Sequence, residues 1–246
     1  MRITDLLKPE GIKLGGAATD KLDAINQMVE LMAKEGNVVD KEQYRKAVLA
    51  REEESTTGVG DGIAIPHAKT SAVSAPGLAA MTVPAGVDYD EPDGEPANLI
   101  FLIAAPNTKE NVHLEVLSRL SILLMDDDFT KSLRAAKTKE EFLDIVDKFE
   151  VAKLAEEVTK MEQAAESGGY EVLAITACPT GIAHTYMAAE ALEKAANARG
   201  IKIKVETQGS VGAKNVLSAE EIRNAKGIII AADKKIELDR FSGKQV

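Results

Sequence analysis

Residues 170–185 of this chain read YEVLAITACPTGIAHT. The first seven are mostly apolar and β-branched, which predicts a strand, and the residues from 183 onward follow the pattern of a helix that Gly200 ends. Cys178 therefore lies in a tight loop where a buried strand turns into a helix. The fold of the second half of the chain is built outward from this turn.

Two further strands complete this region. IKIKVET (201–207) and GIIIAA (227–232) are apolar stretches, and a short helix is expected between them near 218–225. The resulting β-α-β-α-β order predicts a mainly parallel sheet with right-handed crossovers. About 77 residues is short for such a domain. We therefore expect that a C-terminal helix is missing or that the chain is truncated.

The first half of the chain alternates helical and strand patterns, which predicts a separate α/β domain. Asp20 is a helix cap, Gly36 follows the end of that helix, and NLIFLIA (98–104) is expected to be a strand buried on both faces. The other expected elements are helices at 40–53, 110–125 and 138–148, strands at 63–65 and 78–83, and an irregular loop over 55–70.

A charged, Ala-rich helical stretch followed by Ser167-Gly168-Gly169 is typical of a tether between domains. We therefore predict domains at 1–148 and 169–246 with a linker at 149–168. The alternative is that the stretch is only the last helix of the first domain.

Composition excludes several classes of function. The net charge is −10, with 40 acids against 30 bases, which argues against broad contact with nucleic acid or anionic lipid. One cysteine permits no disulfide within the chain, which fits a reducing cytoplasm. There is no signal-peptide core and no run of about 18 apolar residues. The spacing of histidines and cysteine matches no metal site, and no cofactor motif occurs.

Cys178 is a candidate nucleophile. At a helix N-terminus the dipole and the unpaired N–H groups can lower a thiol pKa from about 8.5 to between about 3.5 and 7.5 and can hold a phosphate. The hydroxyls of Thr180 and Thr185 could add donors. The alternative is a small buried cysteine that serves packing. A cysteine phosphatase would need an arginine six residues on, where this chain has His184.

His67 ends a loop, GDGIAIPH (60–67), whose glycines and proline restrict the backbone before the ring. A neutral imidazole can attack phosphorus near pH 7. His113 lies near a helix start, where the dipole keeps its ring neutral and able to bond a phosphate. Arg51 could pair with phosphate. The alternatives are a polar loop histidine and a solvated charge at a helix end.

Both motifs resemble one family. TTGVGDGIAIPHAKT (56–70) is similar to the active-site loop of the IIA domain of the fructose/mannitol class of the bacterial phosphoenolpyruvate-dependent sugar phosphotransferase system. VLAITACPTGIAHTYMAAEALEKAA (172–196) resembles the IIB domain of its fructose branch. The first motif also resembles nitrogen-regulatory IIA proteins, which lack a IIB domain.

The resemblance implies a role for each matching residue. His67 would receive phosphate from the carrier protein HPr, with His113 as the second active-site histidine and Arg51 as the arginine ahead of the loop. Cys178 would be the phosphorylated cysteine. Its supporting loop would be Pro179, Thr180, Gly181, His184 and Thr185. The family folds are a mixed α/β sandwich for IIA and a four-stranded, mainly parallel sheet for IIB.

The expected function is that of a phosphotransferase that passes phosphate from HPr to His67, to Cys178 and then to fructose or a similar sugar. The sugar would be held by a separate membrane permease, IIC, so we expect a cytoplasmic chain at the inner face of the membrane. Two other functions stay open: a regulatory module whose phosphorylation a partner senses, and a cysteine phosphatase.

Overall fold

The computed structural model describes residues 2–107, 112–166, 169–178, 183–209 and 212–244, without the side chains of 112–117, 157–166 and 183. Contacts divide the chain into two compact units. The first holds residues 1–113 and 126–150, and the second holds 114–125 and 151–246. Each unit contains its own sheet and helices, so the predicted two-domain α/β fold is confirmed.

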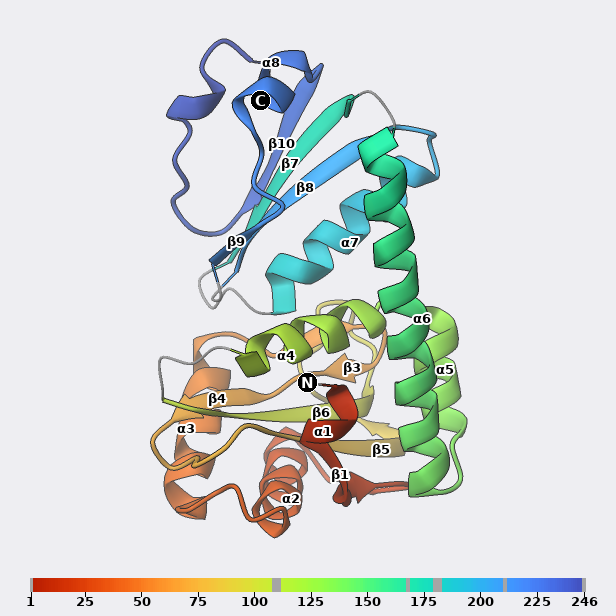
Figure 1. The fold of residues 1–246 in the computed structure, drawn as a ribbon. Helices are drawn as coiled ribbons and strands as arrows, with labels where there is room; N and C mark the ends of the chain where they lie inside the picture. Colours follow the sequence, from red (N-terminus) through yellow and green to blue (C-terminus); the bar gives the residue numbers. More distant parts are fainter. Residues whose placement is uncertain (1, 108–111, 167–168, 179–182, 210–211, 245–246) are drawn as a thin grey trace. The chain divides into compact units, whose positions relative to one another are not determined.

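The first unit contains a mixed sheet in the order β1-β5-β6-β3-β2, with β4 also paired to β6 (Figure 1). β5 runs antiparallel to β6, whereas β1 is parallel to β5, and both β3 and β4 are parallel to β6. The strands are β1 (Leu7–Lys13), β2 (Gly58–Gly60), β3 (Ile63–Ala64), β4 (His67–Thr70), β5 (Gly77–Val87) and β6 (Ala97–Pro106).

Aspartates begin three helices of this unit. The side chains of Asp20, Asp40 and Asp126 accept hydrogen bonds from backbone N–H groups of the first turns, which stabilises each helix by about 1 kcal/mol. The helices up to residue 166 are α1 (Ile3–Leu6), α2 (Lys21–Lys34), α3 (Lys41–Glu54), α4 (Val112–Leu123), α5 (Asp127–Ala135) and α6 (Lys139–Glu166). Of these, α4 from residue 114 and α6 from residue 151 belong to the second unit. The sequence missed α1 and α5, which are short.

Strand β6 supplies core side chains to both faces of the sheet, as NLIFLIA predicts. Ile100 and Leu102 pack with α2 and α3 in one apolar cluster. Phe101 points the other way because successive side chains of a strand alternate, and its ring lies 6.2 Å from that of Phe142 in α6. Burial of both faces fixes the register of the strands around the loop that carries His67.

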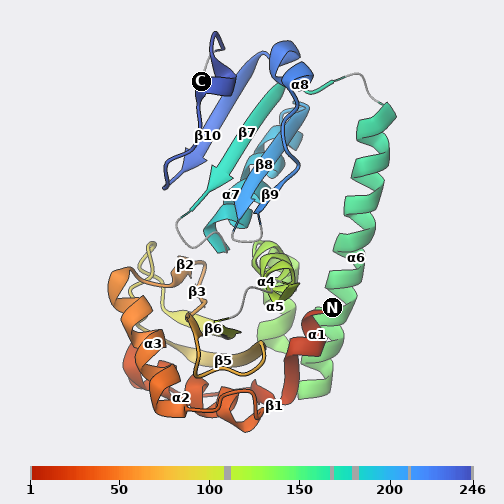
Figure 2. The same ribbon diagram turned by 60° about the vertical axis from the view of Figure 1, so that its left-hand side comes forward.

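Helix α6 is one unbroken helix of 28 residues, as Figure 2 shows. The sequence predicts a helix at 138–148 and a separate helical stretch in the linker. The two join because no glycine or proline interrupts residues 139–166. No helix in the described part of the chain is both long enough and apolar enough to cross a membrane.

The second unit has a four-stranded sheet in the order β10-β7-β8-β9. β10, β7 and β8 are parallel, as predicted, and β9 is an antiparallel strand that the sequence missed. Its elements are β7 (Val172–Ala177), α7 (Ala183–Asn197), β8 (Ile203–Gly209), β9 (Gly212–Lys214), α8 (Ala219–Asn224), β10 (Gly227–Ala232) and a 3-10 turn (Asp239–Phe241).

Both faces of β7 are covered. Ala174 packs with Ala189 of α7 on one face. Leu173 and Ile175 point to the other face, where they meet Ile222 of α8 and the 3-10 turn's Phe241. β7 is therefore a central buried strand, and its carboxyl end is held firmly in place.

A tight turn connects β2 to β3. Gly60, Asp61 and Gly62 have φ angles of 92°, 55° and 69°, a left-handed run that glycine adopts without strain. Two carboxylates hold the turn: Glu91 accepts from the N–H of Gly60 at 2.7 Å, and Asp93 accepts from the N–H of Asp61 at 2.7 Å. The turn is therefore fixed by hydrogen bonds from its backbone N–H groups to two side-chain carboxylates.

Burial raises the pKa of Glu91 to about 7, although the hydrogen bond from Gly60 opposes the shift. The native state then binds more protons than the unfolded chain between about pH 5 and pH 7, since an unperturbed glutamate has a pKa of about 4.3. We predict that this group makes the free energy of unfolding fall as pH rises through that window. Glu35, whose pKa burial also raises to about 7, adds to the same slope.

Replacing Glu91 by glutamine should remove about half of this slope, as measured by urea denaturation at pH 5, 6 and 7. Glu95→Gln is the matched control, because Glu95 is an exposed carboxylate of the same loop. A Glu91→Gln protein with the full wild-type slope would contradict the assignment.

Candidate functional site

His67 is the first residue of β4, directly after the loop that begins at Ser55. It pairs with Ile103 in the central strand β6, and the N–H of Ile103 donates to Pro66 O at 3.0 Å. The preceding residues, Ile63 to Ile65, are buried. His67 is half-buried. Its backbone is held by the pairing with β6 and by the buried residues that precede it.

The imidazole has a defined orientation. Its Nδ1 lies 2.9 Å from the carbonyl oxygen of Ile65. Because a carbonyl only accepts, Nδ1 carries the proton in the neutral ring, and Nε2 carries the lone pair. In a neutral ring held this way, Nε2 is the nitrogen that would carry out a nucleophilic attack.

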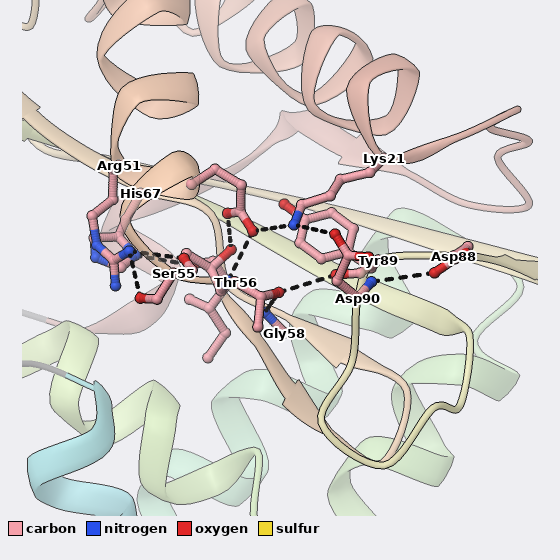
Figure 3. Close-up of polar contacts among 12 residues, drawn as sticks. Lys21, Arg51, Ser55, Thr56, Gly58, His67, Asp88, Tyr89 and Asp90 are labelled. Atoms are coloured by element: carbon pink, nitrogen blue, oxygen red, sulfur yellow. Dashed lines mark hydrogen bonds and ion pairs between the residues drawn. The ribbon is translucent and has the colours of Figure 1, made fainter.

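Arg51 lies in the last turn of α3, the helix that packs on β4. Its Nη1 donates to the carbonyl oxygen and the hydroxyl of Ser55 at 3.1 and 3.3 Å (Figure 3). The described residues hold no carboxylate within ion-pair distance of Arg51 and no hydrogen-bond partner for its buried Nε. A guanidinium held this way retains donors for an anion at the His67 loop.

His113 is the second residue of α4. The helix starts where the sequence predicts, but the side chain of His113 lies outside the described residues. Its expected role as a phosphate donor therefore stays a prediction.

Cys178 directly follows β7. The neighbours of this strand are β8 on one side and β10 on the other, so the strand order reverses there. In parallel α/β sheets ligands bind at the carboxyl ends of strands at such a switch point. The sulfur is buried, with 2% of Cys178 exposed.

The hydroxyl of Thr185 lies in hydrogen-bond contact with this sulfur. Thr185 Oγ1 donates to Cys178 Sγ at 3.0 Å from the first turn of α7, and Thr185 is fully buried. A hydroxyl donor favours a thiolate over a thiol. Of the other predicted supporting residues, His184 is exposed, whereas Pro179, Thr180 and Gly181 lie outside the described residues.

The sequence reasoning missed the polar groups behind the His67 loop. Glu52 follows Arg51 and is buried, and Lys21 and Tyr89 lie beside it. The four consecutive charged residues at 51–54 are the pattern of a solvated helix end, yet one of these glutamates, Glu52, is buried. Glu52 lies four residues after Val48, so both side chains point to the same side of α3. This helical spacing could have indicated that Glu52 is buried.

Within the described residues, no group of three histidine, cysteine, aspartate or glutamate side chains is placed to hold a metal ion.

Two family models match the chain. Residues 5–149 match the phosphoenolpyruvate-dependent sugar phosphotransferase system, EIIA 2, and residues 173–246 match a model described as the lactose/cellobiose-specific IIB subunit of the same system.

Named relatives agree with these matches. The chain is 47% identical over all of its length to the fructose-specific EIIABC component of Bacillus subtilis, and 33% identical over 99% of it to the 2-O-alpha-mannosyl-D-glycerate-specific EIIABC component of Escherichia coli. It spans only 39% and 36% of the lengths of these relatives. The crystal structure of the nitrogen regulatory protein IIA-Ntr from Neisseria meningitidis matches with a TM-score of 0.54 at 28% identity, covering 58% of this chain and 97% of that one.

The chain carries a histidine whose Nδ1 lies against a backbone carbonyl in the part that the EIIA model matches, and a cysteine at a strand end in the part that the IIB model matches. It belongs to the EIIA 2 family of the phosphoenolpyruvate-dependent sugar phosphotransferase system and joins to that domain a IIB domain of the same system.

Proposed function

We propose that this chain relays a phosphoryl group through His67 and Cys178 to a sugar. Nε2 of His67 attacks the phosphorus of a phosphohistidine on HPr, forming an N–P bond as the donor's N–P bond breaks. The thiolate of Cys178 then attacks, forming an S–P bond and releasing His67. A sugar hydroxyl finally takes the phosphoryl group, loses its proton and releases the thiolate.

The observation that carries this proposal is the presence of both acceptors in one chain, each in the part that an EIIA or IIB model matches. The steps are in-line displacements, which depend on alignment and on stabilisation of the phosphoryl charge. Carrying both acceptors on one chain keeps each at an effective concentration on the order of mM for the other. We place the acceptors in domains 1–148 and 169–246, joined by 149–168.

The supporting roles follow from chemistry. Arg51 would pair with the phosphoryl oxygens at His67, and His113 would donate a hydrogen bond to them. At Cys178, Thr185 would keep the sulfur ionised. The residues Pro179, Thr180, Gly181 and His184 would form the loop that holds the phosphoryl group at the N-terminus of α7.

The sugar acceptor is proposed to be fructose or a close analogue. The basis is the identity to a fructose-specific relative, together with the CPTGIAHT loop. The names of another relative and of the IIB model mention different sugars, so mannosylglycerate and cellobiose belong in the test. The partners would be HPr and a membrane IIC permease, which would bring the chain to the inner face of the membrane.

The two other functions are less well supported. A regulatory module of the IIA-Ntr type would need only the first domain and has no use for a cysteine acceptor. A cysteine phosphatase would need a cation at position 184, where an exposed histidine stands.

Incubation with phosphoenolpyruvate, the general phosphocarrier proteins and a IIC permease should label His67 and Cys178. We expect His67→Ala to abolish both labels and Cys178→Ser to retain the His67 label while sugar phosphorylation is lost. Phosphopeptide mapping by mass spectrometry at neutral pH and assays with the three sugars measure these outcomes. A Cys178→Ser protein that phosphorylates sugar at the wild-type rate would overturn the relay.

Replacing Thr185 by valine removes the hydroxyl donor to the sulfur and keeps the side-chain shape. We expect Cys178 to react several-fold more slowly with iodoacetamide at pH 7, since the thiolate is the reacting form. Thr176→Val is a matched control: Thr176 is also buried, two residues before the cysteine, and its hydroxyl has no partner among the described residues. Equal slowing in both variants would refute a specific role for Thr185.

A further inference from the structure

We propose that Glu52 is the positioning residue for His67: its carboxylate holds the loop whose Ile65 carbonyl orients the imidazole. The inference rests on the proposed function, because it assigns how His67 is kept ready to accept phosphate. Glu52 touches neither the ring nor any phosphate. It acts through Thr57 and Ile65.

The carboxylate of Glu52 binds one residue at two points. Oε1 accepts from the backbone N–H of Thr57 at 2.9 Å, and Oε2 accepts from the Thr57 hydroxyl at 2.5 Å. Both residues are buried, with 9% of Glu52 and 3% of Thr57 exposed. Two bonds from one carboxylate fix both the position and the rotation of Thr57, the residue that leads into β2.

Thr57 passes this constraint to the histidine. Its carbonyl oxygen accepts from the N–H of Ile65 at 2.9 Å, at the end of the β2–β3 hairpin away from its turn. The carbonyl of the same Ile65 faces Nδ1 of His67 at 2.9 Å. Three successive contacts therefore connect Glu52 to the nitrogen that must keep its proton if Nε2 is to be the nucleophile.

Lys21 makes the arrangement electrostatically possible. Its Nζ lies 2.6 Å from Glu52 Oε1 and 3.1 Å from Asp90, and 4.9 Å from the centre of the Tyr89 ring. Burial opposes the charged form of this lysine, but its bonds to Glu52 and Asp90 outweigh that effect and raise its pKa. The oxygens of Glu52 thus face the ammonium group of Lys21 and both donors of Thr57.

Thr56, the residue before Thr57, is also held by hydrogen bonds. Thr56 Oγ1 donates to the carbonyl oxygen of Tyr89 at 3.0 Å and accepts from the N–H of Gly58 at 3.1 Å (Figure 3). Thr56 is thus bound by the carbonyl of Tyr89, and Thr57 by the carboxylate of Glu52. These contacts set the shape of the loop before phosphate binds. Alignment of the reacting groups in advance lowers the barrier to an in-line displacement.

Glu52→Ala, Glu52→Gln and Thr57→Val test this role, and Glu53→Gln is the matched control because Glu53 is the next glutamate of α3 and is exposed. The assay follows phosphorylation of His67 by phosphorylated HPr at a range of donor concentrations. Nitrogen-15 NMR of the imidazole reports in parallel which ring nitrogen carries the proton.

We expect Glu52→Ala to lower the maximal rate by about 100-fold with KM for the donor changed by no more than about twofold. Its ring should populate both tautomers, whereas the wild-type ring is protonated at Nδ1. Glu52→Gln, which keeps one acceptor, and Thr57→Val, which removes one of the two bonds, should lie between. If circular dichroism finds Glu52→Ala unfolded, these two variants carry the comparison against Glu53→Gln.

The two proposals fail in different ways. If wild-type His67 takes no phosphate, the relay is wrong, while the NMR comparison still tests Glu52. If wild type is phosphorylated and the folded Glu52 variants match it in maximal rate and tautomer, the positioning role is wrong. Loss of thermal stability alone, with rate and tautomer unchanged, counts against it as well.

Discussion

The hydrogen bond between Nδ1 of His67 and the carbonyl oxygen of Ile65 is the contact on which the proposed chemistry of the first domain depends. An imidazole has two nitrogens and one proton when neutral, and this bond decides which nitrogen carries the proton. Its partner is a backbone group in a buried segment, so side-chain motion cannot displace it. The glycine turn, the pairing of β3 and β4 with β6, and the bonds to Thr57 all bear on where that carbonyl points.

Cys178, the proposed second acceptor, is held by contacts of another kind. Cys178 has its position from a central strand of a parallel sheet and a hydroxyl donor from the helix that follows. A histidine needs its proton placed, whereas a cysteine needs its proton removed. The carbonyl of Ile65 accepts from the ring of His67, whereas the hydroxyl of Thr185 donates to the sulfur of Cys178. In the proposed relay, a phosphoryl group that moves from nitrogen to sulfur would meet an oriented nucleophile at each step.

The sequence predicted the features that local chemistry determines. Asp20 caps the helix that it was expected to cap, and NLIFLIA is buried on both faces of the sheet. The loop motifs identified His67 and Cys178, and the family matches agree with that reading at the level of domains. Strands β1 and β9 were missed because Pro9 interrupts one and the other has three exposed residues. Strands β2 and β4 were also missed: both are short, and they lie in the glycine- and proline-containing stretch 55–70 that was expected to be an irregular loop.

What the sequence could not predict depends on contacts between distant segments. Glu52 lies among four consecutive charged residues, and only the folded structure separates its buried carboxylate from its exposed neighbours. Lys21, Glu52 and Tyr89 come from three elements, and nothing in their spacing along the chain joins them. Thr185 was expected to add a hydroxyl donor, but only the structure shows which atom it meets, the Cys178 sulfur at 3.0 Å.

The relay is tested most directly by a single turnover of the isolated chain. His67 is phosphorylated, the donor is removed, and phosphorus-31 NMR then follows the N–P and S–P signals without sugar or permease. The account predicts that an S–P signal grows as the N–P signal decays, and that inorganic phosphate appears only later. Decay of the N–P signal directly to inorganic phosphate, with no S–P signal in the wild type, would contradict it.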